Sequence, residues 1–345
     1  MAISTADGWF AAAKQKILMQ RVSLTTVASQ QFSLWGIAGN PGAGTRIVGN
    51  STTGVVPTDA TAGAPNINAF GSGATGYLAA ARFRNTVPGS AVLYDRLVHF
   101  GTATNLTPTG TTTYTAPASS TNASVSGTVL TVSGSVTGTF LPGMPITGTG
   151  ITAGTIILSN GTGSGGTGTY NLSASSAATG TITVSGWPQI ASRLPGFPSG
   201  TIDFGNIEIL LEVTAAVAAS AVTVSITYTN QAGVTGRSTG ASAALTSFTL
   251  DRMIAMPLQA GDTGVQKIEA IVIGGTAAAT GSVNVILARR LATFDLRGTV
   301  GGLDAQGWDL TGAPVVFADS CLWLTTLIDS TVGGSVSLDL DIING

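Results

Sequence analysis

Apolar and polar residues alternate with a period of two in several segments of the chain. In residues 221–229, Val222, Val224, Ile226 and Tyr228 alternate with Thr and Ser, and residues 207–213 and 335–342 repeat the pattern with Glu or Asp between apolar residues. Successive side chains of a strand point to opposite faces, so the pattern predicts strands with one buried and one polar face. Further strands are expected at 91–97, 266–273, 282–288 and 321–328.

Strands of this kind, separated by glycine-rich and proline-rich turns, are typical of antiparallel sheets packed face to face. We therefore expect an all-β chain. Its main body is predicted to be a jelly-roll-like antiparallel β-sandwich built from residues 1–120 together with 187–345.

The segment between these two parts differs in composition. No Asp, Glu, Lys or Arg occurs between Arg96 and Arg193, and residues 122–185 are rich in Thr, Gly and Ser. Short apolar alternations there predict four or five short strands, which would form an inserted β module of about 64 residues, close to the smallest size that folds alone. The flanking stretches 107–120 and 187–198 have the Pro and Thr content of connectors.

A different period is found at the start of the chain. Trp9, Phe10, Ala13, Ile17 and Leu18 fall on one stripe of a helical wheel. This spacing predicts an amphipathic helix over residues 6–20, with Thr5 as its N-cap. Such a helix either packs against its own sandwich or docks on a neighbouring subunit.

Charge is scarce, which excludes several classes of protein. Charged residues make up 9% of the 345 residues, against about 25% in an ordinary soluble domain, the net charge is −2, and 43% of residues are apolar. A disordered chain needs more charge and less apolar content, and nucleic-acid binding through a basic face is not expected. One cysteine, Cys321, and one histidine, His99, exclude an intramolecular disulfide and a multi-histidine metal site.

A low content of charged residues is also found in proteins that span a membrane. The longest uncharged apolar segments are 213–228, which turns into strict alternation, and 270–288, which glycines interrupt. Neither fits a spanning helix, and residues 1–21 lack the basic start and apolar core of a signal peptide. We expect a soluble protein made in a cytoplasm, with no membrane partner.

Two glycine patterns look like nucleotide-binding motifs. Residues 71–76 match G-x-G-x-x-G, and Asp95 follows 19 residues later, but the preceding segment 64–70 has no strand pattern. With 47 glycines an accidental match is expected, and 163–168 is a second one. The segment 39–45 resembles a phosphate loop but lacks the lysine that contacts phosphates. Chance explains the match at 71–76, turns explain the other two segments, and no cofactor is expected.

The remaining candidates for chemistry each have a simpler explanation. His99 fits a general base only if a nucleophile lies nearby, and a structural histidine fits as well. Cys321 is expected to be a small buried side chain. Asp339 and Asp341 share a strand face and would ligate calcium only if loops supplied more oxygens. Arg82, Arg84, Arg289 and Arg290 are expected to form local ion pairs or subunit contacts. No catalytic, cofactor-binding or metal-binding residue is assigned.

Several segments resemble structural proteins of tailed bacteriophages. They are 7–16, 32–35, 39–44, 228–237, 258–266 and 316–320. The insert is similar to a small glycine- and threonine-rich module of other phage virion proteins, chiefly in 141–146 and 165–170. The resemblance implies a virion component and carries no catalytic residues.

These observations favour a non-enzymatic capsid decoration or cement protein. Its expected partners are the major capsid protein or other virion proteins, and copies of itself in a trimer or ring. One alternative is a tail or fibre-associated protein whose insert contacts the host surface. Another is a glycan-degrading enzyme, which would need two carboxylates converging in a cleft.

Overall fold

The chain is described by a computed structural model, in which the described residues are 8, 14–24, 28–46, 54–70, 75–102, 105–108, 110–113, 118–184, 190–197, 202–296, 302–329 and 334–344. Regular structure in these residues is almost entirely β, and the ladders between named strands are antiparallel. The helical pieces with described bounds are short, namely η1 (Ile190–Arg193) and α2 (Trp308–Thr311). The prediction of an all-β chain of the antiparallel sandwich class is confirmed.

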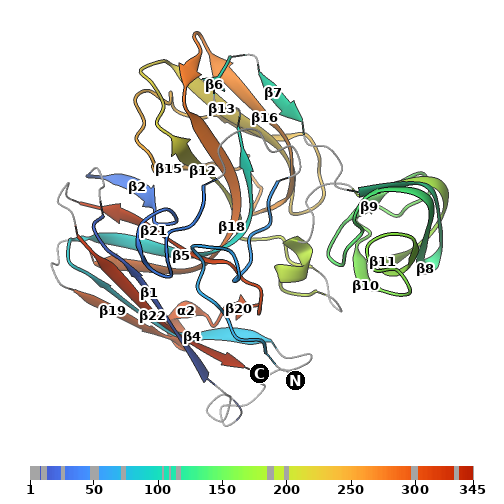
Figure 1. Cartoon of the computed structure of the whole chain (residues 1–345), viewed down its shortest axis with the longest axis horizontal. Helices are drawn as coiled ribbons and strands as arrows, with labels where there is room; N and C mark the ends of the chain where they lie inside the picture. Colours follow the sequence, from blue (N-terminus) through green and yellow to red (C-terminus); the bar gives the residue numbers. More distant parts are fainter. Residues whose placement is uncertain are drawn as a thin grey trace.

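Three sheets form the body (Figure 1). The lower sheet has the order β19 (Leu303–Gly307), β4 (Gly76–Asn85), β22 (Val336–Asn344), β1 (Lys14–Arg21), β3 (Gly39–Asn40), with β20 (Val315–Val316) also beside β4. The central sheet has the order β15 (Met253–Met256), β12 (Ile207–Ala215), β18 (Ser282–Leu296), β5 (Gly89–Gly101), β21 (Leu322–Ile328), β2 (Gln30–Ser33). The upper sheet has the order β14 (Arg237–Ala241), β13 (Val222–Asn230), β16 (Val265–Gly275), β7 (Thr111–Thr113), and β17 (Ala279–Thr280) pairs with β6 (Asn105–Leu106).

The central sheet is shared by two hydrophobic cores. One end of β5 and β18, with β12, packs against the upper sheet, where Val285 and Leu211 meet Ile226 and Ile271 in one cluster. The other end of β5 and β18, with β21, packs against the lower sheet, where Phe294 stacks on Phe83 at 5.4 Å between ring centroids. The long strands β5 and β18 therefore tie two sandwiches into one body.

A third apolar cluster involves the central strands as well. Trp35, Tyr94 and Trp323 belong to it, together with Leu210 of β12 and Cys321. Leu210 lies next to Ile209 and Leu211, which belong to the core under the upper sheet. Because neighbouring strand residues face opposite ways, the middle of the central sheet is buried on both faces.

Residues 118–184 form a sheet of their own, which we call the module. Its strands are β8 (Ala118–Gly138), β9 (Ile146–Thr147), β10 (Ile157–Asn160) and β11 (Gly168–Val184), and in the described chain they pair only with one another. Leu130, Phe140, Ile157 and Tyr170 belong to its separate core. Figure 1 shows the module at one side of the body. The sequence predicts four or five short strands, whereas the structure has two long strands, β8 and β11, and two short ones, β9 and β10.

The predicted helix over 6–20 is wrong over residues 14–20, whereas Gly8 is helical. Residues 14–20 belong to strand β1, in which Ile17 and Met19 are buried while Lys16 and Leu18 are exposed. Pairing with β22, more than 300 residues away, fixes this strand. Long-range pairing outweighs local helical periodicity here. Apart from Gly8, the rest of the predicted helix and its cap Thr5 lie outside the described residues.

The strands predicted from alternation are confirmed as β5, β12, β13, β16, β18, β21 and β22. The predicted connectors are more structured than expected. β7 and the start of β8 lie within 107–120, and η1 lies within 187–198. The domain boundaries at 120, 122, 185 and 187 remain predictions.

Candidate functional site

The most buried ionic group of the described chain is the pair formed by Arg96 of β5 and Glu212 of β12. Both side chains are fully buried, and Arg96 Nη2 lies 2.8 Å from Glu212 Oε2. The guanidinium carbon lies 4.8 Å from the ring centroids of both Trp35 and Trp323. Ser33 donates to the carboxylate, and Asn284 Nδ2 lies 3.4 Å from it. Hydrogen bonds and two indole faces therefore replace the water that these charges lose.

His99 belongs to this cluster. Its Nδ1 accepts a 2.9 Å hydrogen bond from Arg96 Nε. Burial and the neighbouring Arg96 charge hold the pKa of His99 well below its ordinary value. Burial alone would raise the pKa of Glu212, but attraction and hydrogen bonds from Arg96, with Ser33 and Asn284, outweigh it and keep that pKa low. The cluster is thus a fixed ion pair beside a neutral histidine.

A second buried cluster surrounds Asp95. Arg193 of η1 donates to its carboxylate, as do the Ser320 hydroxyl at 2.8 Å and the Cys321 backbone N–H at 3.0 Å, and Arg289 lies 3.7 Å away. Burial raises the pKa of the Cys321 thiol to about 12. A thiol with this pKa stays protonated and is a poor nucleophile.

Arg193 also links the module to the body. It donates to the Pro57 and Arg96 carbonyl oxygens as well as to Asp95. Its neighbour Ser192 lies directly beside Gly143 of the module, where a Cβ atom would meet the Ser192 backbone nitrogen at 2.9 Å. The chain that returns from the module is therefore fastened to the body by a buried arginine.

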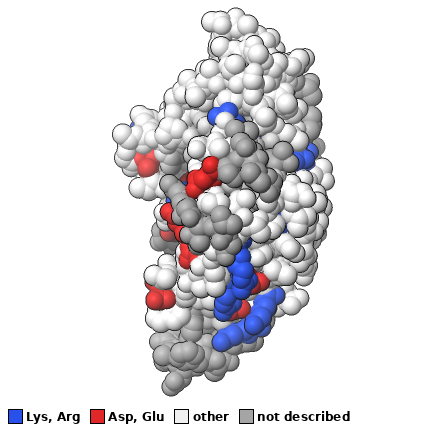
Figure 2. All heavy atoms as spheres, turned by 90° about the vertical axis from the view of Figure 1, so that its left-hand side faces the viewer, with Lys and Arg blue, Asp and Glu red and all other residues white. Residues whose placement is uncertain are grey.

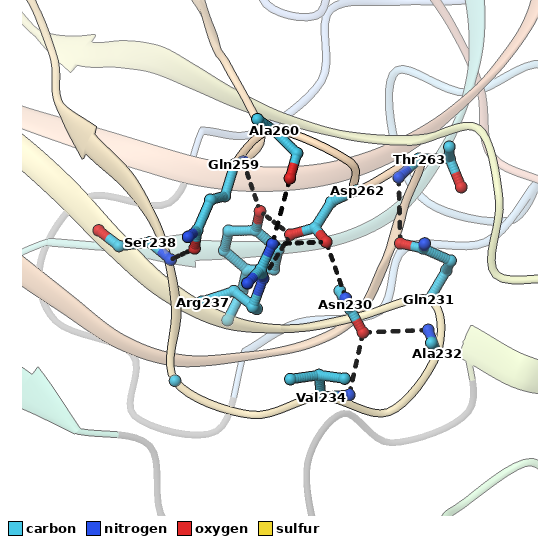
Figure 3. A network of polar contacts seen from close by, with 12 residues as sticks. Asn230, Gln231, Ala232, Val234, Arg237, Ser238, Gln259, Ala260, Asp262 and Thr263 are labelled. Atoms are coloured by element: carbon cyan, nitrogen blue, oxygen red, sulfur yellow. Dashed lines mark hydrogen bonds and ion pairs between the residues drawn. The ribbon is translucent and has the colours of Figure 1, made fainter.

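A polar network joins the turn after β13 to the loop before β16, as Figure 3 shows. Asp262 accepts hydrogen bonds from Tyr228 Oη at 2.6 Å, Asn230 Nδ2 at 2.7 Å and Arg237 Nε at 2.9 Å. The Arg237 hydrogen bond is the main reason that the pKa of Asp262 falls to about 2. Burial, followed by the bond to Asp262, raises the pKa of Tyr228 to about 12. The network holds these two loops together, and the hydrogen bonds that Asp262 accepts leave its carboxylate fully engaged.

The remaining acidic candidates are engaged in ion pairs. Asp339 of β22 pairs with Arg84, and Asp341 pairs with Arg82 at 2.9 Å, both across to β4. Arg290 pairs with Glu208 at 2.6 Å. In the described part of the chain no group of three or more His, Cys, Asp or Glu side chains is placed to hold a metal ion.

The glycine patterns lie in turns and strands. Gly76 opens strand β4, where a dinucleotide fold would need a helix, and residues 71–74 lie outside the described residues. In the segment 163–168, the Gly165 N–H donates to Tyr170 Oη at 2.9 Å, and that hydroxyl donates to the Gly166 carbonyl at 2.7 Å. Gly163 packs so closely on the Tyr170 ring that a Cβ atom would clash.

Two open grooves flank the lower sheet. One of about 640 Å³ lies between β18, β19 and α2, and Glu208, Arg290, Asp304 and Leu310 contribute to its wall. The other, of about 570 Å³, runs beside β1 and is lined by Lys16, the segment 40–43 and the segment 59–66. Within the described residues, no helix is long and apolar enough to span a bilayer.

Sequence reasoning placed Glu212 on a solvated strand face and overlooked its pairing with Arg96. Their contact joins residues 116 positions apart. One signal was present, because Leu210 lies between Glu208 and Glu212 on the supposedly polar face. An apolar residue there indicates that this face is buried as well.

Comparisons with known proteins give no family. No family model matches the chain, and no curated protein matches it. Among solved structures, a subviral particle of infectious bursal disease virus VP2 aligns over 87% of this chain and 84% of its own, with 11% identity and a TM-score of 0.18. The Gt strain of the same virus aligns over 96% and 82%, with 14% identity and a TM-score of 0.15. Such scores establish neither a common fold nor a common function.

Proposed function

We propose that the chain is a non-enzymatic structural protein of a bacteriophage virion that decorates or cements the capsid. The observation that carries the proposal is the separation of charge between module and body. The stretch from 97 to 192 contains no charged side chain, yet it holds a complete four-stranded sheet with its own core. A module with a core of its own can project from the particle while the body packs against the shell, which is the arrangement expected of a decoration protein.

The use of polar chemistry in the body supports the same proposal. The most buried carboxylates, Asp95 and Glu212, are saturated by arginines, and the thiol of Cys321 has a raised pKa. These groups hold strands and loops together instead of facing an open cleft. Six segments resemble virion proteins of tailed phages, and this resemblance suggests that the assembly is a phage particle.

Quantitative analysis of purified virions tests the proposal. A cement protein should be present in many copies per particle, in a simple ratio to the major capsid protein. Absence from the particle, or a few copies only, would contradict it. Sustained release of sugar from a glycan by the purified chain would overturn the non-enzymatic assignment.

The position of the module supports a second candidate, a tail or fibre-associated protein that contacts the host. The module lies beside the body in Figure 1, and its ends are adjacent because Ser119 of β8 pairs with Thr183 of β11. Replacing residues 120–182 by a short Gly-Ser linker therefore removes the module without stretching the body. A cement role predicts stable, infectious particles, whereas a host-contact role predicts intact particles that fail to adsorb.

A further inference from the structure

The outward side of the lower sheet carries side chains in rows that the strand register sets. Register places Leu18, Asp339, Arg82 and Ala305 in one row across four strands. The row on one side of it consists of Lys16, Asp341, Ala80 and Gly307. The row on the other side consists of Gln20, Ser337, Arg84 and Leu303. We call these three rows, with Lys14 at their edge, the ladder face. The opposite side of the same strands forms the core with the central sheet.

The ladder face carries a positive charge that the rest of the chain lacks. Lys14, Lys16, Arg82 and Arg84 stand against Asp339 and Asp341 in these rows, which gives +2 in a chain of net charge −2. The exposed Asp309 of the neighbouring helical turn α2 lowers the charge of the face and α2 together to +1. The two arginines are paired with the two acids. Lys14 and Lys16 are exposed and have no carboxylate within ion-pair distance in the described chain. In Figure 2 most of the surface is white, and basic groups gather in its lower half beside acidic ones.

Large apolar side chains are exposed on the same face and next to it. Leu18 is 47% exposed and Leu303 is 53% exposed. The helical turn α2, which follows β19 directly, adds Trp308 at 56% and Leu310 at 69%. The exposed Leu and Trp side chains therefore lie at the two edges of the face, and the paired charges lie on its two central strands. An exposed Trp is typical of the residues that anchor protein interfaces.

We propose that the ladder face, with α2 at its edge, docks the chain onto an acidic protein surface of the virion shell. Lys14 and Lys16, which form no ion pair with the described residues, select carboxylates, while Trp308 and Leu310 supply the apolar contact. A nucleic-acid backbone fits less well, because its phosphates offer no apolar partner to the exposed Trp and Leu side chains. A second copy of the same surface would place one net positive charge against another, which is unfavourable. The inference rests on the proposed function, because it takes the partner from the shell.

Co-sedimentation with particles of the same virus, assembled without this chain, tests the docking face. The chain should bind, and binding should weaken between 0.1 M and 1 M salt, since the screening length falls from about 10 Å to about 3 Å. Lys16→Glu and the neutral double variant Lys14→Gln/Lys16→Gln should each bind about tenfold more weakly, and Trp308→Ala should lose a similar factor. The matched control is Lys267→Glu on β16 of the upper sheet, which changes net charge as Lys16→Glu does and should bind like the unmodified chain.

The outcomes separate the two proposals. Failure of the unmodified chain to bind particles at either salt concentration would overturn the proposed function itself. Normal binding by all three ladder-face variants, with unchanged unfolding temperatures, would overturn the docking face and leave the function standing. Retention of a duplex DNA fragment that depends on Lys14 and Lys16, with particle binding unaffected by these variants, would reassign the face to nucleic acid.

Discussion

The polar groups buried in the body include paired charges, whereas those described in the module are hydroxyls and backbone groups. Arg96 and Glu212 lie fully buried between two indoles. In the module, Tyr170 bonds to backbone groups of Gly165 and Gly166, and Ser120 bonds to the Ser133 carbonyl. The ionic clusters of the body leave a few buried atoms without a hydrogen-bond partner, namely Arg193 Nε, Arg289 Nε and Asn284 Oδ1. Only the ionic arrangement depends on pH and on both charged partners being present.

The difference follows from how each part is built. The body joins segments far apart in the chain, and its ion pairs bridge Arg96 to Glu212 and Arg193 to Asp95. The module folds from 67 consecutive residues, from Ala118 to Val184, whose two long strands run beside each other. Buried ion pairs between distant segments favour one arrangement of the body, whereas local hairpins need only glycine turns and apolar alternation.

The largest expected effect is on the body. Arg96→Met removes one member of a fully buried pair and leaves the Glu212 carboxylate without its counter-charge. We expect the free energy of unfolding to fall by about 3–5 kcal/mol, measured by urea denaturation followed through Trp fluorescence. The matched control is Arg84→Met at the exposed pair with Asp339, for which about 0–1 kcal/mol is expected. Equal losses for the two variants would contradict the assignment of the buried pair.

The second largest loss of stability is expected in the module, on removal of a single hydroxyl group. Tyr170→Phe removes the hydroxyl that joins Gly165 to Gly166 and leaves two backbone groups without their partner. We expect a loss of about 1–3 kcal/mol, seen as faster amide hydrogen exchange in residues 118–184. Exchange in the body should stay unchanged. Faster exchange across both parts would show that they unfold together.

The pH dependence of stability should also differ between the two parts, because the one histidine lies in the body. His99 is buried and neutral, so the unfolded chain binds a proton more readily than the folded one as pH falls below about 6.5. Stability should decline there by about 1.4 kcal/mol per pH unit from this group. His99→Gln should flatten this decline, as measured by unfolding at pH 7 and pH 5. An unchanged slope would contradict a neutral buried histidine.

The smallest effect is expected at the Asp262 network. With a pKa of about 2, against about 3.9 in an unfolded chain, Asp262 stabilises the fold above pH 4 and loses this contribution as pH falls toward 2. Carbon NMR of the side-chain carboxyl should show a midpoint near 2, and Arg237→Gln should move it upward. A midpoint near 4 in the unmodified chain would contradict the network.

Strands with strict alternation could be predicted because one face of each is buried, as in β13 and β22. Strand β1 could not, because Ile17 and Leu18 fit a helical stripe and only the distant β22 decides between the two structures. The long strands of the module could not be predicted, because glycines such as Gly127 and Gly134 are typical of turns in a sequence. In the structure both have positive φ and lie inside strand β8. The ionic clusters could not be predicted, since their members are brought together by the sheet order alone.

The central claim is that the chain decorates the shell of a virion, with the body docked and the module outside. A difference map between cryo-electron microscopy reconstructions of particles with the full chain and with the module-deleted chain tests it most directly. The account predicts missing density at regularly repeated positions on the outside of the head, one for each copy of the module. Missing density confined to the tail, or no difference on the particle at all, would contradict it.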